Sequence, residues 1–384
     1  MVSDALVDRV IRLIEPDRMA VEVGRKRQDT IGRGESPDYL PLSLEGVPVE
    51  ERRDFCQSNR PYCRFDHRER FYDEKKMLFE KAWGLVGSAR AASDGQLSVA
   101  PEMGAGFLPS ILGLKQELFE DKDPWLRQRM SKDEINDLEE DDIDAVSDRG
   151  LMPRAIQTIE YFQEKLGSKS RVFIDYTWGP FSLAHLIRGE RIFMDILRDP
   201  EFVHHLMEIT TRLYVMACQT LKEEIGEVSG QGYKGRFFMS DAGVWSNEDT
   251  AILLSPGLAE EFLVPYLRRA YSPFGGAIVH LCGKADHLLE LLLDIPEVKG
   301  INLGEPGKQD MSYEQIMGMV LERGKVYYGR WPRSEGEDTE AYFRRILCRL
   351  EERKGLVLSY RLDSEERDRP GKVMDLWHRL QDQL

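Results

Sequence analysis

Short apolar runs recur along the chain, and each ends in a polar residue and leads into a segment with helical spacing. Runs of this kind, separated by longer helical patterns, are typical of parallel β-α-β units. Eight runs predict strands: Tyr39–Leu44, Leu97–Pro101, Arg171–Tyr176, Arg236–Asp241, Ala277–Cys282, Gly300–Glu305, Lys325–Arg330 and Leu356–Arg361. Eight such units favour an α/β protein of the closed (β/α)8-barrel (TIM barrel) class, with an open doubly wound sheet as the alternative.

The helices between these runs are clearest in the second half of the chain. Pro200–Glu224 carries apolar residues at helical spacing, and Ser255–Ala270 begins with a serine suited to the N-cap and a proline at the first helical position. Further helices are expected at Asp286–Leu293, Ser312–Glu322, Asp338–Arg353 and Pro370–Leu384.

The predicted strands account for most of the chain, so we expect one barrel domain over residues 1–384. Residues 1–38 form a helical extension before the first strand, and residues 119–170 form an acidic helical insertion between strands 2 and 3. The most acidic part, residues 119–150, is interpreted as a solvated surface on the barrel rim. A lid or a partner-docking surface is the functional alternative.

The net charge and composition of the chain limit the classes of partner that it can bind. The formal net charge of −15 argues against nucleic acid and anionic membranes, because both need basic surface. The N-terminus has no apolar core of a signal peptide, and no window is long and apolar enough to span a membrane. Five scattered cysteines argue against a disulfide framework and favour a reducing cytoplasm. The sequence leaves the oligomeric state open, a homodimer included.

Charged and polar residues end the predicted strands, and in a (β/α)8 barrel those ends surround the active site. The residues in question are Glu45, Glu102, Asp175, Asp241, His280 with Cys282, Glu305, Arg330 and Arg361. A strand must also end in polar residues wherever it meets water, so position alone does not make each of them functional. Trp178 and Trp245 follow strands as well, and either lining a pocket or packing in the core would suit them.

His280 and Cys282 are two residues apart on one strand, so their side chains share a face. An imidazole and a thiolate at this spacing can bind one Zn²⁺, and Glu305 at the end of the next strand supplies a candidate oxygen ligand. The alternative is a core cysteine beside a hydrogen-bonded histidine.

Three segments resemble the uroporphyrinogen decarboxylase superfamily over about half the chain. They are FIDYTWGPFSLAHLIRG (173–189), FFMSDAGVWSNEDTAILLSPGLAEEFLVPYLRRAY (237–271) and HLCGKADHLLELLLDIPEVKGINLGEP (280–306). The resemblance implies a (β/α)8 barrel. The superfamily includes true decarboxylases, zinc-dependent methylcobamide:thiol methyltransferases, and relatives that demethylate small compounds with a corrinoid protein.

The chain resembles the methyltransferase branch more closely than the decarboxylases. The decarboxylases carry a Met-Arg-Gln-Ala-Gly-Arg motif that holds substrate carboxylates, and this sequence has only RKRQDTIGRG (25–34) there. Their serine corresponds to Ser240, beside Asp241. The methyltransferase branch begins its zinc site at residues matching His280 and Cys282, but Ser359 stands where that branch has a further cysteine.

Three hypotheses follow. The first is a methyltransferase that moves a methyl group between a small methylated compound or thiol and a corrinoid carried by a partner protein, with zinc at His280, Cys282 and Glu305. The second is a decarboxylase of a tetrapyrrole or other carboxylated substrate. The third is a non-catalytic barrel that binds a tetrapyrrole or corrinoid. For an enzyme, the expected catalytic residues are Asp241, Asp175 and Arg330, and the expected substrate-binding residues are Glu102, Ser240, Trp178, Trp245 and Arg361.

Overall fold

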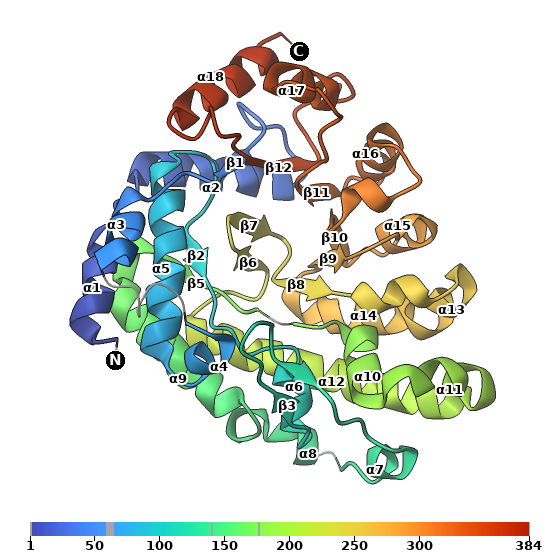
Figure 1. Ribbon diagram of the computed structural model, residues 1–384. Helices are drawn as coiled ribbons and strands as arrows, with labels where there is room; N and C mark the ends of the chain where they lie inside the picture. Colours follow the sequence, from blue (N-terminus) through green and yellow to red (C-terminus); the bar gives the residue numbers. More distant parts are fainter. Residues whose placement is uncertain (1, 59–64, 140, 176, 384) are drawn as a thin grey trace.

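The strands surround one axis and the helices form an outer layer, as the computed structural model of residues 2–58, 65–139, 141–175 and 177–383 shows (Figure 1). Six strands form a parallel sheet in the order β1–β12–β11–β10–β9–β8. Their bounds are Leu42–Glu45 for β1, Val244–Asn247 for β8, Ala277–Leu281 for β9, Val298–Leu303 for β10, Val326–Gly329 for β11 and Leu356–Arg361 for β12.

A second, two-stranded parallel sheet occupies the remaining arc of the ring. It pairs β2 (Ser98–Val99) with β5 (Arg171–Val172). Isolated backbone hydrogen bonds connect the two sheets: the Asn247 N–H donates to Thr177, and the Asp94 N–H donates to Leu42. The predicted fold class is therefore confirmed, although regular strand pairing does not run around the whole ring.

The fourth predicted strand is wrong. Arg236–Asp241 does not join the ring; its apolar part is β7 (Phe237–Ser240), which pairs antiparallel with β6 (Gln231–Lys234) in a hairpin. The hairpin turn has two residues, with Gly235 first at φ +58°, as a type II′ turn requires. The fourth strand of the ring is β8, whose sequence VWSN is too short and polar to stand out as a buried strand.

The hairpin β6–β7 lies inside the ring, where Figure 1 shows it enclosed by the other strands. Its tip is held by Ser98, whose hydroxyl donates to the Gly235 carbonyl at 2.5 Å. Its base is held by Lys222, a buried residue that donates to the carbonyls of Gln231 and Gly243 at 2.7 and 2.8 Å. The hairpin thus fills space that barrel side chains alone fill in a simpler barrel.

Most predicted helices are confirmed. The longest is α12 (Pro200–Ile225), and others surround the ring: α10 (Pro180–Arg188), α11 (Ile192–Arg198), α15 (Asp286–Leu293), α16 (Tyr313–Glu322), α17 (Thr339–Leu347) and α18 (Pro370–Gln381). The helix expected at Ser255–Ala270 is divided into α13 (Pro256–Phe262) and α14 (Val264–Tyr271). Pro265 lacks the N–H that a continuous helix needs, which explains the break. Ser255 caps α13 as expected.

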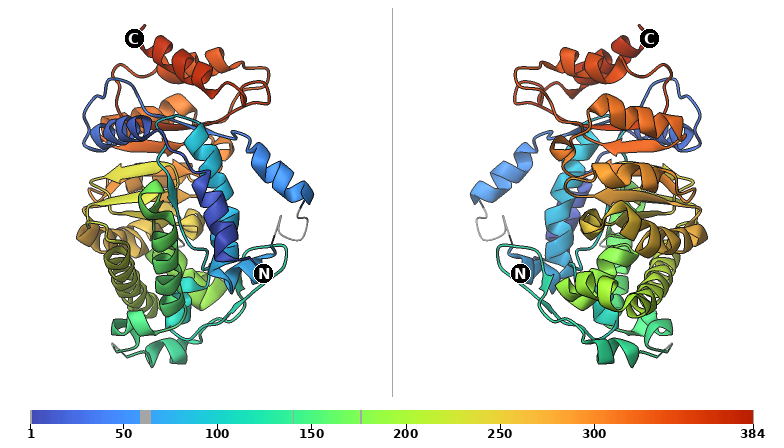
Figure 2. Two further views of the ribbon diagram at one scale, coloured as in Figure 1. Left: turned by 90° about the vertical axis from the view of Figure 1, so that its left-hand side faces the viewer. Right: turned by 90° about the vertical axis from the view of Figure 1, so that its right-hand side faces the viewer.

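The N-terminal extension forms α1 (Asp4–Arg12) and α2 (Arg18–Gly32). After β1 come α3 (Glu50–Ser58), which projects from the side of the barrel in Figure 2, then α4 (His67–Phe71) and α5 (Glu74–Arg90). The region after β2 contains α6 (Phe107–Ile111), a small hairpin of β3 (Gln116–Glu117) and β4 (Trp125–Leu126), α7 (Lys132–Asn136), α8 (Asp141–Asp144) and α9 (Met152–Leu166). None of the helices in the described part of the chain combines the length and apolar character of a membrane span.

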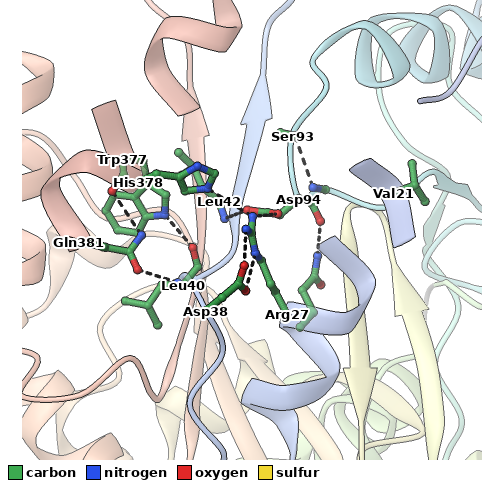
Figure 3. A network of polar contacts seen from close by, with 12 residues as sticks. Val21, Arg27, Asp38, Leu40, Leu42, Ser93, Asp94, Trp377, His378 and Gln381 are labelled. Atoms are coloured by element: carbon green, nitrogen blue, oxygen red, sulfur yellow. Dashed lines mark hydrogen bonds and ion pairs between the residues drawn. The ribbon is translucent and has the colours of Figure 1, made fainter. Parts of the chain in front are cut away.

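A partly buried ionic network ties α2 to β1 and α18 (Figure 3). Arg27 donates to Asp94 at 2.8 Å and to Asp38 at 2.8 and 2.9 Å. Asp94 also accepts from the Leu42 N–H at 3.0 Å. Burial, together with the Arg27 charge, lowers the pKa of His378, whose Nε2 lies 3.3 Å from the same guanidinium. Arg27 therefore stabilises the fold near the start of β1 and does not lie at the strand ends.

Candidate functional site

A cavity of about 510 Å³, called here the strand-end cavity, lies where several ring strands end. Phe237 of the hairpin forms one part of its wall. Its polar lining residues come from β1, β9, β10 and β12 and from the loop after β11: Glu45, His280, Asn302, Ser359 and Arg330. His280 and Arg330 are thus brought to one cavity, as the strand-end pattern predicts.

The orientation of the His280 imidazole is set by Asn302 on the neighbouring strand. His280 Nδ1 lies 2.5 Å from Asn302 Oδ1, while Asn302 Nδ2 donates to the Tyr328 carbonyl at 2.5 Å. Because the amide nitrogen is used by the carbonyl, the amide oxygen faces the imidazole and accepts the Nδ1 proton. In its neutral form the imidazole then carries its lone pair on Nε2, where a metal ion or a proton can bind.

Cys282 follows β9 and its sulfur converges with His280 Nε2 above Gly304. Each of these two atoms is 3.2 Å from the point that a Cβ on Gly304 would occupy, so they lie within twice that distance of each other. Partial burial raises the pKa of the Cys282 thiol, and the carboxylates of Asp249 and Glu305 add to the effect. The thiol is therefore protonated near neutral pH unless a cation is placed beside it.

Asp249, which follows β8, is a member of this group that the strand-end pattern does not predict. Its Oδ1 accepts from the Cys282 N–H at 2.8 Å and lies 3.6 Å from His280 Nε2. Burial raises the pKa of Asp249, and His280 opposes that rise. Asp249 fixes the turn on which Cys282 lies and places a carboxylate beside the free imidazole nitrogen.

The three predicted zinc ligands are only partly assembled. His280 and Cys282 converge, but the Glu305 carboxylate forms an ion pair with Lys308. Within residues 2–58, 65–139, 141–175 and 177–383, no group of three His, Cys, Asp or Glu side chains is arranged to hold a metal ion. The donor types suit zinc, while the arrangement supplies two converging donors rather than three.

The opposite side of the strand-end cavity carries a carboxylate with its partners. Ser359 donates to Glu45 at 2.5 Å, and the Arg236 guanidinium lies 3.6 Å from the same carboxylate oxygen. Arg330 has no ion-pair partner in the part of the chain that the structure describes. The cavity therefore offers one uncommitted cation to a substrate.

Aromatic rings form the floor between the hairpin and the strands. Trp245 on β8 is buried, stacks on Phe237 with centroids 6.0 Å apart, and lies 6.3 Å from the His280 ring. Trp178 lies elsewhere: it pairs with Asn247 beside the start of α10 and packs against the core. Of the two predicted tryptophans, only Trp245 contacts residues of the cavity.

Asp241 and Ser240 do not lie at the strand ends. Both come at the end of β7 and before β8, and the nearby Gly243 N–H donates to Phe274 and Gly276 just before β9 begins. That is the amino end of the ring. Ser240 is buried against Gly32 of α2, and Asp241 is exposed in a left-handed conformation at φ +58°. The expectation that these two residues face the active site is wrong, because their strand belongs to the hairpin.

Three further predicted residues lie outside the lining of the strand-end cavity. Asp175 forms an ion pair with Lys234 of the hairpin. Glu102 faces the helices: burial alone would raise its pKa, but Lys81 at 3.0 Å and Arg70 at 3.5 Å lower it.

Arg361, the third of these, ends β12 with an exposed side chain near Gly46. None of the three residues lines the strand-end cavity.

Glu248 is a buried residue next to Asp249 that sequence patterns did not single out. Its carboxyl accepts from the N–H groups of Phe181 and Ser182 at 3.3 and 3.0 Å, at the start of α10. Its own N–H donates to the His280 carbonyl at 2.9 Å. Burial raises the pKa of Glu248 to about 8, against the effect of these hydrogen bonds. Glu248 thereby links the Gly-Pro-Phe-Ser stretch to β9.

The fold and the cavity define a barrel of the (β/α)8 class with its polar groups at the strand ends. The sequence matches the family described as uroporphyrinogen decarboxylase (URO-D) over residues 106–320, more than half of the chain. The chain belongs to this family. Its structure is similar to that of a methyltransferase from Methanosarcina mazei, with a TM-score of 0.64 and 14% identity over 93% of this chain and 99% of the other. A comparison with curated protein sequences gives no match.

Proposed function

We propose that this protein is an enzyme of the methyltransferase-like branch of its family. It would move a methyl group between a small methylated compound or a thiol and a corrinoid carried by a partner protein. The observation that carries the proposal is the convergence of His280 Nε2 and Cys282 Sγ above Gly304, with Asn302 holding the imidazole from behind. A nitrogen lone pair and a thiol that lie over the same glycine suit the binding of a metal ion or the activation of a thiol.

The charge of the strand-end cavity favours methyl transfer over decarboxylation of a tetrapyrrole. A substrate with several carboxylates needs several cations, because each buried carboxylate must be paired. Here Arg236 lies against Glu45, and Arg330 is the one uncommitted cation among the described lining residues. Glu45 also adds negative charge where such a substrate would need positive charge. A small, weakly charged methylated compound fits this lining better.

Zinc remains a prediction within this proposal. His280 and Cys282 would hold it, and Glu305 would have to exchange Lys308 for the metal, since that ion pair now occupies its carboxylate. When bound, the ion would stabilise a thiolate at neutral pH and act as a Lewis acid. The residues of the chain supply the rest: Asn302 orients the imidazole, Asp249 holds the Cys282 backbone, and Trp245 and Phe237 close the floor against water.

The test uses the full chain, purified without a polyhistidine tag, with free methylcobalamin and a small thiol as probes. We expect about one zinc per chain after zinc loading, and slow methyl transfer visible as a change in the corrinoid absorbance spectrum. Both should be lost in Cys282→Ala. Cys348→Ala is the matched control, because Cys348 is an exposed thiol at the end of α17, away from the strand ends.

Two results would overturn the proposal. If Cys282→Ala and Cys348→Ala both bind zinc as the unaltered protein does, the His-x-Cys pair is not a metal site. If no methyl transfer is detected and the unaltered chain instead releases carbon dioxide from uroporphyrinogen, the decarboxylase hypothesis takes its place.

A further inference from the structure

A second and larger cavity, of about 630 Å³, lies at the amino end of the ring, and we call it the lower cavity. Its walls come from α2, the beginning of β5, the end of α12 and the hairpin β6–β7. A side pocket of about 260 Å³ adjoins it and shares five lining residues: Glu22, Arg25, Ser170, Arg171 and Tyr233. The two spaces therefore form one continuous site, with none of the residues of the strand-end cavity among its lining.

Two arginines of the lower cavity form no ion pair with a carboxylate in the described part of the chain. They are Arg25 on α2 and Arg171 at the start of β5. This is unusual for the molecule, whose net charge is −15 and whose other cations near the ring are mostly paired. Lys222, for example, is 2.8 Å from Glu227. Two guanidinium groups at one cavity, neither in an ion pair, make a binding site for an anion.

Aromatic residues lie beside both arginines, and Arg171 also interacts electrostatically with the Glu227 carboxylate. The Arg25 guanidinium carbon lies 5.7 Å from the centroid of the buried Phe238 ring, a cation–π contact that leaves its N–H donors free. Tyr233, paired with Phe238 across the hairpin, lies near both arginines, which act against the rise in its pKa caused by burial. Both arginine side chains are exposed at the cavity, and the hydrogen bond between Arg171 and Tyr233 leaves further N–H donors for a ligand.

The remaining lining is mixed in polarity, and Glu22, Gln163 and Gln231 are polar members of it. Val172, Ile225 and Val228 supply apolar wall. Glu227 Oε2 accepts from Lys222, but Glu227 Oε1 is buried and has no hydrogen-bond partner among the described residues. A hydroxyl or amide N–H on the ligand would satisfy that oxygen.

We propose that the lower cavity binds a small organic anion, recognised through its carboxylate or phosphate oxygens by Arg25 and Arg171. The proposal is independent of the methyl-transfer proposal, because it rests on residues at the opposite end of the ring. Carboxylate and phosphate ligands share the oxyanion chemistry that two arginines recognise, and the experiment separates them.

The experiment measures thermal stabilisation and calorimetric binding of the full chain with three probes at millimolar concentration. The probes are succinate, inorganic phosphate and phenyl phosphate, which differ in the anion and in the apolar body. We expect at least one to bind and raise the melting temperature, because a ligand that binds only the folded state stabilises it. Succinate alone would identify a carboxylate site, and phenyl phosphate above inorganic phosphate would identify a phosphate ester site.

The variants Arg25→Gln and Arg171→Gln should each weaken binding by about tenfold or more, since each loses a charge-assisted hydrogen bond. Arg198→Gln is the matched control, because Arg198 is an exposed arginine at the end of α11, outside the lining of both cavities. Circular dichroism establishes that each variant is folded. The proposal is overturned if none of the probes binds, or if both cavity variants bind as tightly as Arg198→Gln does.

Discussion

The imidazole of His280 is fixed by the side-chain amide of Asn302, which is fixed in turn by the carbonyl of Tyr328. Three neighbouring strands, β9, β10 and β11, therefore determine which nitrogen of His280 faces the strand-end cavity. The consequence is a histidine whose Nε2 is available without any rearrangement of the strands.

We expect Asn302→Leu to lower methyl transfer or zinc affinity by about 10- to 100-fold, the usual cost of losing a group that orients a metal-binding histidine. Asn302→Asp keeps the acceptor for Nδ1 and should retain more activity, with an altered pH profile because it adds a titratable carboxylate beside the imidazole. The pH profile separates orientation from simple loss of structure. Equal activity in the two variants, with equal pH profiles, would contradict this role.

Gly304→Ala should disturb the same pair directly. A Cβ at this position would lie 2.8 Å from His280 Cε1 and 3.2 Å from Cys282 Sγ, so the imidazole must move. Displacements of this size reduce turnover by up to about 100-fold. Gly307→Ala is the control within the same cavity, because its Cβ would meet only Pro332, at 3.7 and 3.8 Å. Kinetics that do not distinguish the two variants would show that His280 and Cys282 are not the reactive pair.

Glu248→Gln should change how stability depends on pH. Burial raises the pKa of Glu248 from 4.5 to about 8, so the folded protein holds a proton that the unfolded chain releases above pH 4.5. The stability that this group contributes is complete below pH 4.5 and falls as the pH rises towards 8. Between these two pKa values the free energy of unfolding falls by about 1.4 kcal/mol for each step of one in pH.

Urea unfolding between pH 5 and pH 8 measures this effect. The curve for Glu248→Gln should be flatter than that of the unaltered protein, since glutamine is neutral throughout. Glu35→Gln, at an exposed site, should leave the curve unchanged. If the slope for Glu248→Gln is as steep as before, the carboxyl group is ionised in the folded state.

Asp94→Ala should destabilise the fold far more than Asp38→Ala. Asp94 is buried and accepts from both Arg27 and the Leu42 N–H, so its removal leaves a buried guanidinium and a backbone donor without that acceptor. Breaking a buried pair in this way costs about 3–5 kcal/mol. The Asp38 side chain is 62% exposed, and water can replace it. Denaturation midpoints of the two variants measure how much stability each one loses. Similar midpoints would contradict the prediction that Asp94→Ala is the more destabilising.

Regular features of the fold could be read from the sequence because they repeat. Seven of the ring strands follow apolar runs such as Ala277–Cys282, and α12 follows helical spacing over its full length. The fourth strand could not be found this way, since β8 has only Val244 and Trp245 as apolar residues, whereas β7 has the longer apolar run. The sequence signal for the hairpin is Gly235. It lies in the two-residue gap between Tyr233-Lys234 and Phe237-Phe238.

The sequence predicts the part of the site that depends on a regular strand, and not the part that depends on contacts between elements. His280 and Cys282 share a strand, so their spacing alone brings them together. Asn302 joins this group through the register between β9 and β10, and Asp249 joins it through a loop contact with Cys282. Neither the register nor the loop contact can be predicted from a single sequence. The apolar run before Asp241 predicts a ring strand that ends at the site. In the structure this run is β7 of the hairpin, so Asp241 does not lie at the strand ends.

The hairpin β6–β7 lies between the strand-end cavity and the lower cavity and forms part of the wall of each. Neighbouring residues of a strand point to opposite faces, and in β7 Phe237 lines the strand-end cavity while Phe238 lines the lower cavity. A shift of the hairpin therefore changes the walls of both cavities together. Trp245, stacked on Phe237, therefore changes its surroundings when the hairpin moves.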